Sequence, residues 1–239
     1  MKNFHRIKPV SIFAACSLFV VTPVAAQDAP SQVELRFVAF PRVANPKPVK
    51  LDLGDGKATA VDMPSTNLSK TYKVGAMPEW NLGETAKDEE GNPVFESFGK
   101  VKALEESRQL IVAWRKGEHA ETGLELTAIN STAKGFDAGT CCLINKTDTA
   151  IKGSVGGVEF TLQSGENSII TPGASEKKGT REVSYVKFSY EADDGFKVFH
   201  NSIWRKTPTV RTLAFFFTDP KTKKPKFKII RDYVSTESP

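Results

Sequence analysis

Five lysines lie within eight residues near the C-terminus, and they are the side chains with the clearest capacity to bind a ligand: Lys221, Lys223, Lys224, Lys226 and Lys228. Side chains at alternate positions of a strand point to the same face, so several of these ammonium groups are expected on one strand face. Such a face attracts phosphate, sulfate or uronate groups. Lysines also protect an exposed strand from pairing with other chains, and this alternative stays open.

No arrangement of residues in the sequence is typical of an active site. Nucleophilic catalysis needs a base near a Ser, Cys or Thr, and beyond the first thirty residues the histidines are His119, in a charged turn, and His200, at a strand end. Segment 153–157 lacks the spacing of a nucleophile elbow, and segment 54–57 lacks the Ser or Thr of a phosphate loop. The spacing of Cys, His and acidic residues fits no zinc or calcium motif. We therefore expect no catalytic residue, no metal and no cofactor.

The first twenty-six residues have the layout of a secretory signal peptide. Three basic residues between positions 2 and 8 precede the apolar stretch 10–24, and small residues follow up to Ala26. The apolar stretch is short for a membrane span and contains Pro23, so we expect cleavage after Ala26 and no transmembrane segment after processing. The prediction is a periplasmic or secreted protein.

Removal of this leader changes what the overall charge indicates. The formal net charge falls from +5 to +2, because the leader holds three basic and no acidic residues. The remaining charge is uneven, with ten basic and three acidic residues from Phe196 onward. The overall basicity is therefore no evidence for nucleic acid, and the expected partner is a protein or an anionic glycan of the cell envelope.

Short apolar runs separated by turn residues extend along the rest of the chain. Apolar and charged residues alternate over 49–53, and Gly54-Asp55-Gly56 follows, which is typical of a β-hairpin. The run 110–114 is apolar throughout and suits a strand buried on both faces. Segment 100–108 is the one helix-like stretch, and we expect a single turn or a loop there. The sequence predicts the all-β class with β-sandwich architecture.

The same order of strands and turns occurs twice. The pattern Phe-x-x-Phe at 95–98 recurs at 196–199, and the strand that begins at Arg108 matches the strand that begins at Arg211. The spacing of about a hundred residues is the size of one immunoglobulin-like sandwich. A duplication explains the match, although unrelated β segments also resemble one another.

We therefore predict two tandem immunoglobulin-like β-sandwich units that join between residues 131 and 139. The first unit spans 27–134, and the second spans 138–239 with a basic C-terminal edge. The adjacent Cys141 and Cys142 are expected in a strand without a disulfide between them, because the small ring would be strained. Their side chains then point to opposite faces, which predicts one buried and one partly exposed thiol.

The second half resembles a group of functionally uncharacterised secreted β-sandwich proteins of environmental bacteria. The resemblance rests on Asn-x-Thr at 145–147, Gly-Gly at 156–157, and the segments 165–172 and 211–215. It implies export and a β-sandwich fold, and it implies no known activity.

A second resemblance is to periplasmic pilus chaperones, which have a leader, two immunoglobulin-like domains and a similar length. Segments 108–116 and 143–145 carry this likeness. It implies that a partner binds by strand addition at an exposed sheet edge. The early strands lack the paired basic residues and the alternating strand that those chaperones use.

Three functions are thus open at the level of sequence. The favoured one is an exported, non-enzymatic β-sandwich protein that acts as a binding or structural module of the cell envelope or the extracellular space. The alternatives are a periplasmic chaperone or assembly factor that acts by strand addition, and a hydrolase that uses two carboxylates.

Overall fold

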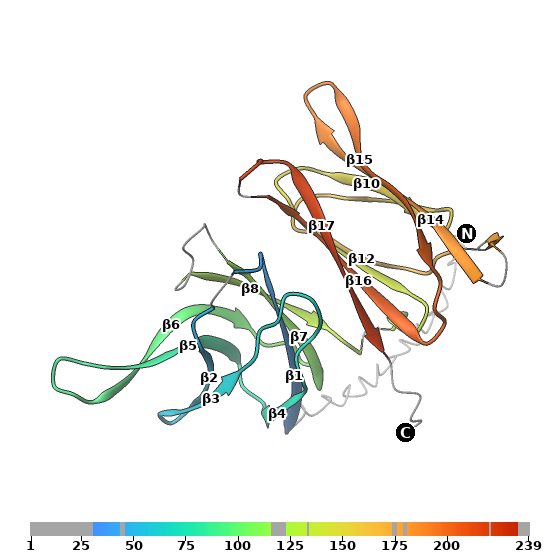
Figure 1. Ribbon diagram of the computed structural model, residues 1–239. Helices are drawn as coiled ribbons and strands as arrows, with labels where there is room; N and C mark the ends of the chain where they lie inside the picture. The colour runs from blue at the N-terminus through green and yellow to red at the C-terminus, as the bar shows by residue number, and fades with distance from the viewer. Residues whose placement is uncertain are drawn as a thin grey trace, which may run out of the picture.

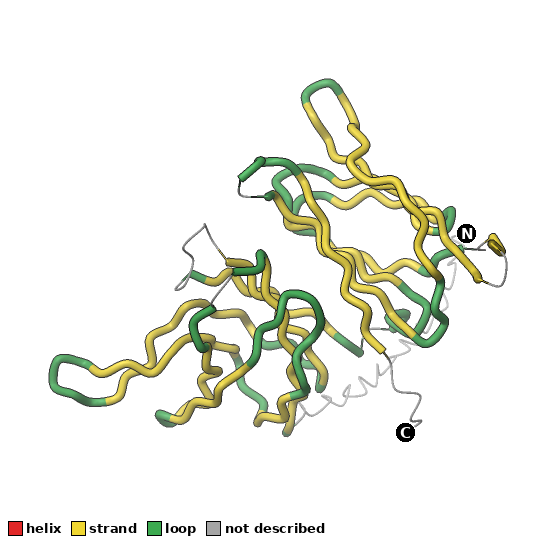
Figure 2. The backbone as a smooth tube through the Cα atoms, viewed as in Figure 1, coloured by secondary structure: helices red, strands yellow, loops and turns green. Residues whose placement is uncertain are grey.

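Every regular element that the structure describes is a β-strand. The computed structural model describes residues 31–43, 46–115, 123–132, 134–173, 176–178, 181–219 and 221–233. Within these ranges seventeen strands form four sheets, and no helix is long and apolar enough to cross a membrane (Figures 1 and 2). The structure confirms the all-β class and the tandem β-sandwich units. The predicted leader and His119 lie outside the described residues.

The first unit contains eight strands in two sheets. Sheet A has the order β4-β1-β7-β8, and sheet B has the order β3-β2-β5-β6. β1 and β7 pair in parallel, and all other described neighbours in these two sheets are antiparallel. The bounds of sheet A are β1 Gln32–Phe40, β4 Tyr72–Gly75, β7 Arg108–Arg115 and β8 Leu124–Asn130; those of sheet B are β2 Val49–Gly54, β3 Lys57–Val61, β5 Glu79–Lys87 and β6 Pro93–Lys102.

The second unit repeats this strand order. Sheet C has the order β12-β9-β16-β17 with a parallel β9–β16 pair, and sheet D has β11-β10-β14 with both β15 and the short extra strand β13 paired to β14. Each strand of the first unit thus has a counterpart in the second. The bounds of sheet C are β9 Cys141–Lys146, β12 Asn167–Ile170, β16 Val210–Thr218 and β17 Pro225–Tyr233; those of sheet D are β10 Ile151–Val155, β11 Val158–Leu162, β13 Glu176–Lys178, β14 Arg181–Ala192 and β15 Gly195–Arg205.

A shared irregularity places the matched Phe-x-x-Phe pattern at the same point of both units. The register between β5 and β6 shifts so that Phe98 is skipped, and the register between β14 and β15 shifts so that Phe199 is skipped. Both hairpins also extend beyond their sheets (Figure 1). One expectation needs correction: segment 100–108 is not a turn throughout, because β6 continues to Lys102 and the loop covers only 103–107.

Three apolar cores hold the four sheets in the order B, A, C, D. One core lies between sheets A and B, a second between sheets A and C, and a third between sheets C and D. On β7, Ile111 and Ala113 belong to the first core, and Leu110, Val112 and Trp114 belong to the second. Sheets A and C are therefore covered on both faces. This burial explains the continuous apolar run 110–114, as the sequence predicted.

The same layering corrects the expectation for the two cysteines. Both thiols are free and buried, with 3% of Cys141 and 1% of Cys142 exposed. Cys141 belongs to the core between sheets C and D, and Cys142 belongs to the core between sheets A and C. Alternation along β9 does separate the side chains, but both faces of this strand are interior.

We expect the two thiols to make the folded chain less stable in alkali. Burial raises the pKa of Cys141 from its ordinary value of 9.0 to about 11 and that of Cys142 to about 12. Between the ordinary pKa of 9.0 and the raised pKa of the native protein, the unfolded thiols ionise while the native thiols stay protonated. The free energy of unfolding therefore falls as the pH rises above 9. At pH 10 the loss is about 1 kcal/mol for each thiol.

Denaturant titrations at pH 8 and pH 10 measure this loss. The double variant Cys141→Ala, Cys142→Ala serves as the reference, because it keeps every other group that titrates in this range. The free energy of unfolding should fall more steeply with pH in the wild type. Equal slopes would show that the thiols ionise in the native state.

Candidate binding site between the two units

Sheets A and C meet through equivalent strands. β8 contacts β9 through the ion pair of Glu125 and Lys146, with 2.8 Å between Oε1 and Nζ, and β17 contacts β1 through Asp232 and Arg36, with 2.6 Å between Oδ1 and Nη1. Since β8 corresponds to β17 and β1 to β9, the same two kinds of strand meet in both places, as in a two-fold dimer, although the two ion pairs use non-equivalent positions of these strands. The interface has a pseudo-two-fold axis, and equivalent positions of both units meet at each of its ends.

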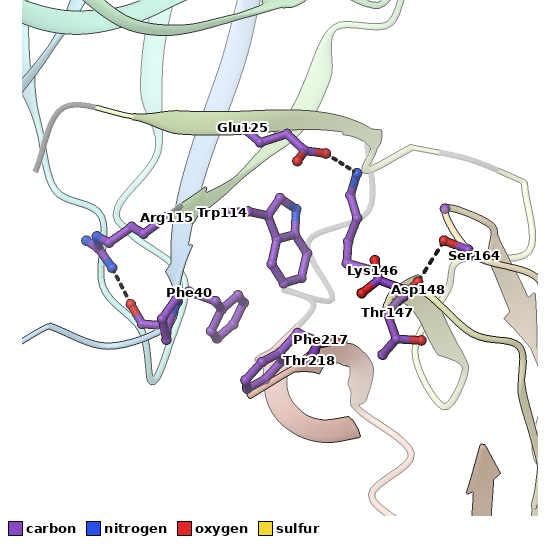
Figure 3. A pocket seen from close by; sticks show the side chains of 12 residues that line it. Phe40, Trp114, Arg115, Glu125, Lys146, Thr147, Asp148, Ser164, Phe217 and Thr218 are labelled. Atoms are coloured by element: carbon purple, nitrogen blue, oxygen red, sulfur yellow. Dashed lines mark hydrogen bonds and ion pairs between the residues drawn. The ribbon is translucent and has the colours of Figure 1, made fainter. Parts of the chain in front are cut away.

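A cleft of about 310 Å³ opens at one end of this interface (Figure 3). Its apolar wall consists of Phe40, Trp114 and Phe217, which lie at or next to the last residues of β1, β7 and β16. Phe40 stacks on Phe217 with 6.1 Å between ring centroids and lies 5.6 Å from Trp114. Trp114 and Phe217 occupy corresponding positions of the two units, so each unit contributes an aromatic ring to the same wall.

Apart from Pro41 and Gly165, the other lining residues are polar or charged, and several are held in place. Lys146 is fixed by its ion pair with Glu125, and Ser164 Oγ donates a hydrogen bond of 2.7 Å to the carbonyl oxygen of Thr147 (Figure 3). Arg115 Nη1 donates to the carbonyl oxygen of Pro41 at 2.8 Å. Burial lowers the pKa of Arg115, but an arginine starts so high that it keeps its charge. Arg115 and Lys146 are matched in the lining by Glu125 and Asp148, so the cleft has no net charge and combines fixed polar groups with an aromatic surface.

The indole nitrogen of Trp114 is the least satisfied polar group of the cleft. Among the described residues, Trp114 Nε1 is one of two buried side-chain nitrogen or oxygen atoms without a hydrogen-bond partner, although Trp114 is only 8% exposed. The nitrogen lies on the side of the ring toward Lys146 (Figure 3). A buried donor without an acceptor costs about 1–3 kcal/mol. Less than 1 Å² of this nitrogen is accessible to solvent, so an acceptor that enters the cleft removes the cost only if a neighbouring side chain moves aside.

A lysine-rich turn begins directly after the cleft residue Thr218. Asp219 organises it: its Oδ1 accepts hydrogen bonds from the backbone N–H groups of Lys221, at 2.9 Å, and Thr222, at 2.8 Å. Lys226 forms an ion pair with the same carboxylate. The hydrogen bond from Lys226 is the main reason that the pKa of Asp219 lies well below its usual range. The turn is thus built around one buried carboxylate.

The five predicted lysines are close in space but do not share one strand face. Lys221, Lys223 and Lys224 lie in the turn, whereas Lys226 and Lys228 lie on β17. The two strand lysines pair with Phe217 and Phe215, so they lie on the face of sheet C that is turned toward the first unit. The predicted position on a strand face is therefore wrong for Lys221, Lys223 and Lys224, because β17 begins only at Pro225. The structure places the lysine group beside the cleft.

Sequence reasoning missed the cleft itself. Phe40, Trp114 and Phe217 are ordinary core residues by pattern. The repeat matches Trp114 with Phe217, but it does not indicate that the ends of their strands converge. His200 packs against Phe227, with 4.3 Å between ring centroids. No group of three or more His, Cys, Asp or Glu side chains in the described ranges is arranged to hold a metal ion.

Comparison with models of known protein families and with curated proteins finds no match to this chain.

Proposed function

We propose that this protein is an exported, non-enzymatic binding module whose ligand is an anionic polysaccharide of the cell envelope or its surroundings. The supporting observation is the aromatic cleft with the unpaired Trp114 N–H beside a group of five lysines. Aromatic rings bury the apolar C–H faces of sugar rings, and an indole N–H seeks an oxygen acceptor. Lysines attract the carboxylates or sulfates that such chains carry.

The shape of the site agrees with a segment of a longer chain. A volume of about 310 Å³ is at the lower end of the range for small-molecule sites. The lysine turn then extends the contact beyond the cleft, where further charged groups of a polymer would lie. The leader predicted for residues 1–26 supports a ligand that is met outside the cytoplasm.

The charge part of this proposal predicts weaker retention of the variant Lys223→Asn, Lys224→Gln on immobilised polygalacturonate. Lys223 has a φ of 54°, which asparagine tolerates well, and the pair of Asp219 with Lys226 stays intact. We expect elution at lower salt, because fewer counterions are exchanged on binding. The matched control, Lys87→Asn with Lys102→Gln, removes two exposed lysines from the first unit. Equal elution of the two variants would contradict a local basic site.

The cleft part is tested with Trp114→Phe, which keeps an aromatic ring and removes the N–H group. If a sugar oxygen accepts this hydrogen bond, affinity for the polysaccharide should fall about fivefold, which corresponds to about 1 kcal/mol. Isothermal titration against oligogalacturonates measures the change. Unchanged affinity together with sensitivity to Lys223→Asn, Lys224→Gln would leave charge attraction alone and reject the cleft as the sugar site.

A further inference from the structure

The two units differ at the side of the sandwich where the edge strands of the two sheets meet. In the first unit these strands are β6 and β8, and they close this side. There β6 runs along β8, and a Cβ added to Gly99 would lie 2.2 Å from the carbonyl oxygen of Leu124. Phe98, Leu124 and Leu126 are at most 8% exposed. The core between sheets A and B is therefore sealed on this side by direct approach of the two backbones.

In the second unit the corresponding edge is open. His200 stands at the place of Gly99, since each follows the skipped phenylalanine, and its ring rests on Phe227. β15 and β17 do not run along each other as β6 and β8 do. As a result Phe199, His200, Trp204 and Phe227 stay half-buried. In the second unit, side chains span the distance between β15 and β17, whereas in the first unit the backbones of β6 and β8 approach each other directly.

The free edge of β15 also lacks the charges that protect its counterpart. Asn201 and Ile203 occupy the places of Lys100 and Lys102 on β6. Between Val198 and Trp204 there is no Lys, Arg, Asp or Glu, and Ile203 is 41% exposed. Among the described strands, β15 pairs only with β14. Proteins usually guard such an edge with lysine, so this one is available for pairing.

Positive charge marks one end of this open edge. A hollow of about 40 Å³ next to Trp204 is lined by Arg205, Lys206 and Arg231 and by no carboxylate. A hollow of this size takes one carboxylate or one water. An acidic group would complement its three cations.

We infer that the free edge of β15 pairs with an extended strand of another polypeptide, which lies over the side chains that bridge β15 and β17. The incoming strand carries apolar side chains at alternate positions, which cover Trp204, His200 and Phe227. An acidic residue or a terminal carboxylate at one end meets Arg205 and Arg231. Backbone hydrogen bonds supply the affinity, and the alternating side chains supply the selection. This site is separate from the inter-unit cleft and does not depend on a glycan ligand.

A displayed library of random nine-residue peptides, selected on the full-length mature protein, tests this site. The variant Asn201→Lys, Ile203→Lys transplants the residues of β6 onto exposed positions of β15 and serves for counter-selection. We expect the wild type to enrich peptides with alternating apolar residues and an acidic end, with at least tenfold weaker binding to the variant. Bound peptide should slow amide hydrogen exchange in β15 and leave exchange in β6 unchanged.

Three results would overturn the inference. In the first, selection yields no peptide that binds the wild type more tightly than the variant Asn201→Lys, Ile203→Lys. In the second, the enriched peptides slow hydrogen exchange in strands other than β15. In the third case, the wild type sediments as a dimer that Asn201→Lys, Ile203→Lys converts to a monomer, which would show that a second copy of this chain occupies the edge. Reversal of the preferred end charge by Arg205→Glu, Arg231→Glu would support the assigned orientation.

Discussion

Replacing Asp232 with alanine is expected to lower the free energy of unfolding by about 3 kcal/mol. Asp232 is 3% exposed and accepts charged hydrogen bonds from Arg36, at 2.6 Å, and from Arg211, at 2.7 Å. Its removal leaves the Arg211 guanidinium, whose side chain is only 14% exposed, without its counter-charge, and that loss dominates. The value is at the lower end for a broken buried pair, because Arg36 remains a third exposed and water screens its charge.

Chemical denaturation measured by circular dichroism is the direct measurement. Glu125→Ala is the matched control, since it breaks a second ion pair between the units, but at a site where the Glu125 side chain is 49% exposed. That change should cost less than about 1 kcal/mol. A triple variant, Arg36→Met, Asp232→Leu, Arg211→Met, should regain most of the stability, because no charge is left unpaired. Equal effects of Asp232→Ala and Glu125→Ala would reject the buried triad as a stabilising contact.

Phe215→Ala is expected to cost about 3–5 kcal/mol, because it empties the centre of the core between the units. Phe215 is fully buried, and its ring centroid lies 4.8 Å from that of Phe40 and 6.1 Å from that of Trp114. Sheets A and C each contribute to two cores, so the loss should be felt in both units at once. We therefore expect the wild type to unfold in one transition and Phe215→Ala to do so at a lower denaturant concentration.

Phe196→Ala provides the comparison for this prediction. Phe196 is 46% exposed on the β14–β15 hairpin, and its truncation should stay within about 0.5 kcal/mol. Tryptophan fluorescence follows both units, because Trp80 and Trp204 lie in the outer cores. If Phe215→Ala leaves the transition seen by fluorescence unshifted, the two units are energetically independent despite their contact.

Local sequence patterns carried the prediction of the fold. Alternation in 49–53 and the following Gly54-Asp55-Gly56 turn produced β2, its turn and β3 as expected. The repeat of Phe-x-x-Phe identified equivalent positions, down to the bulge at Phe98 and Phe199. These features depend on side chains only a few residues apart, which is why one sequence suffices to recognise them.

Local patterns could not predict which residues contact each other across the interface between the units. The burial of both Cys141 and Cys142 follows from a second sheet against β9, which no residue near these cysteines encodes. The lysine group was found by composition, but its division between a turn and a strand depends on where β17 starts. In the aromatic wall of the cleft, Trp114 and Phe217 are equivalent positions of the repeat, but nothing in the repeat indicates that these positions meet or that Phe40 joins them.

The sequence alone thus determined the all-β class, the doubled strand order and the basic character of the C-terminal segment, because periodicity, turn chemistry and charge are local properties. The tertiary structure alone decided that the units pack through equivalent faces, that a cleft opens at one end of this interface, and that the edge of β15 stays free where β6 is sealed. The physical reason is that burial depends on what covers a face, and the covering residues lie far apart in sequence, as Phe40 and Phe215 do.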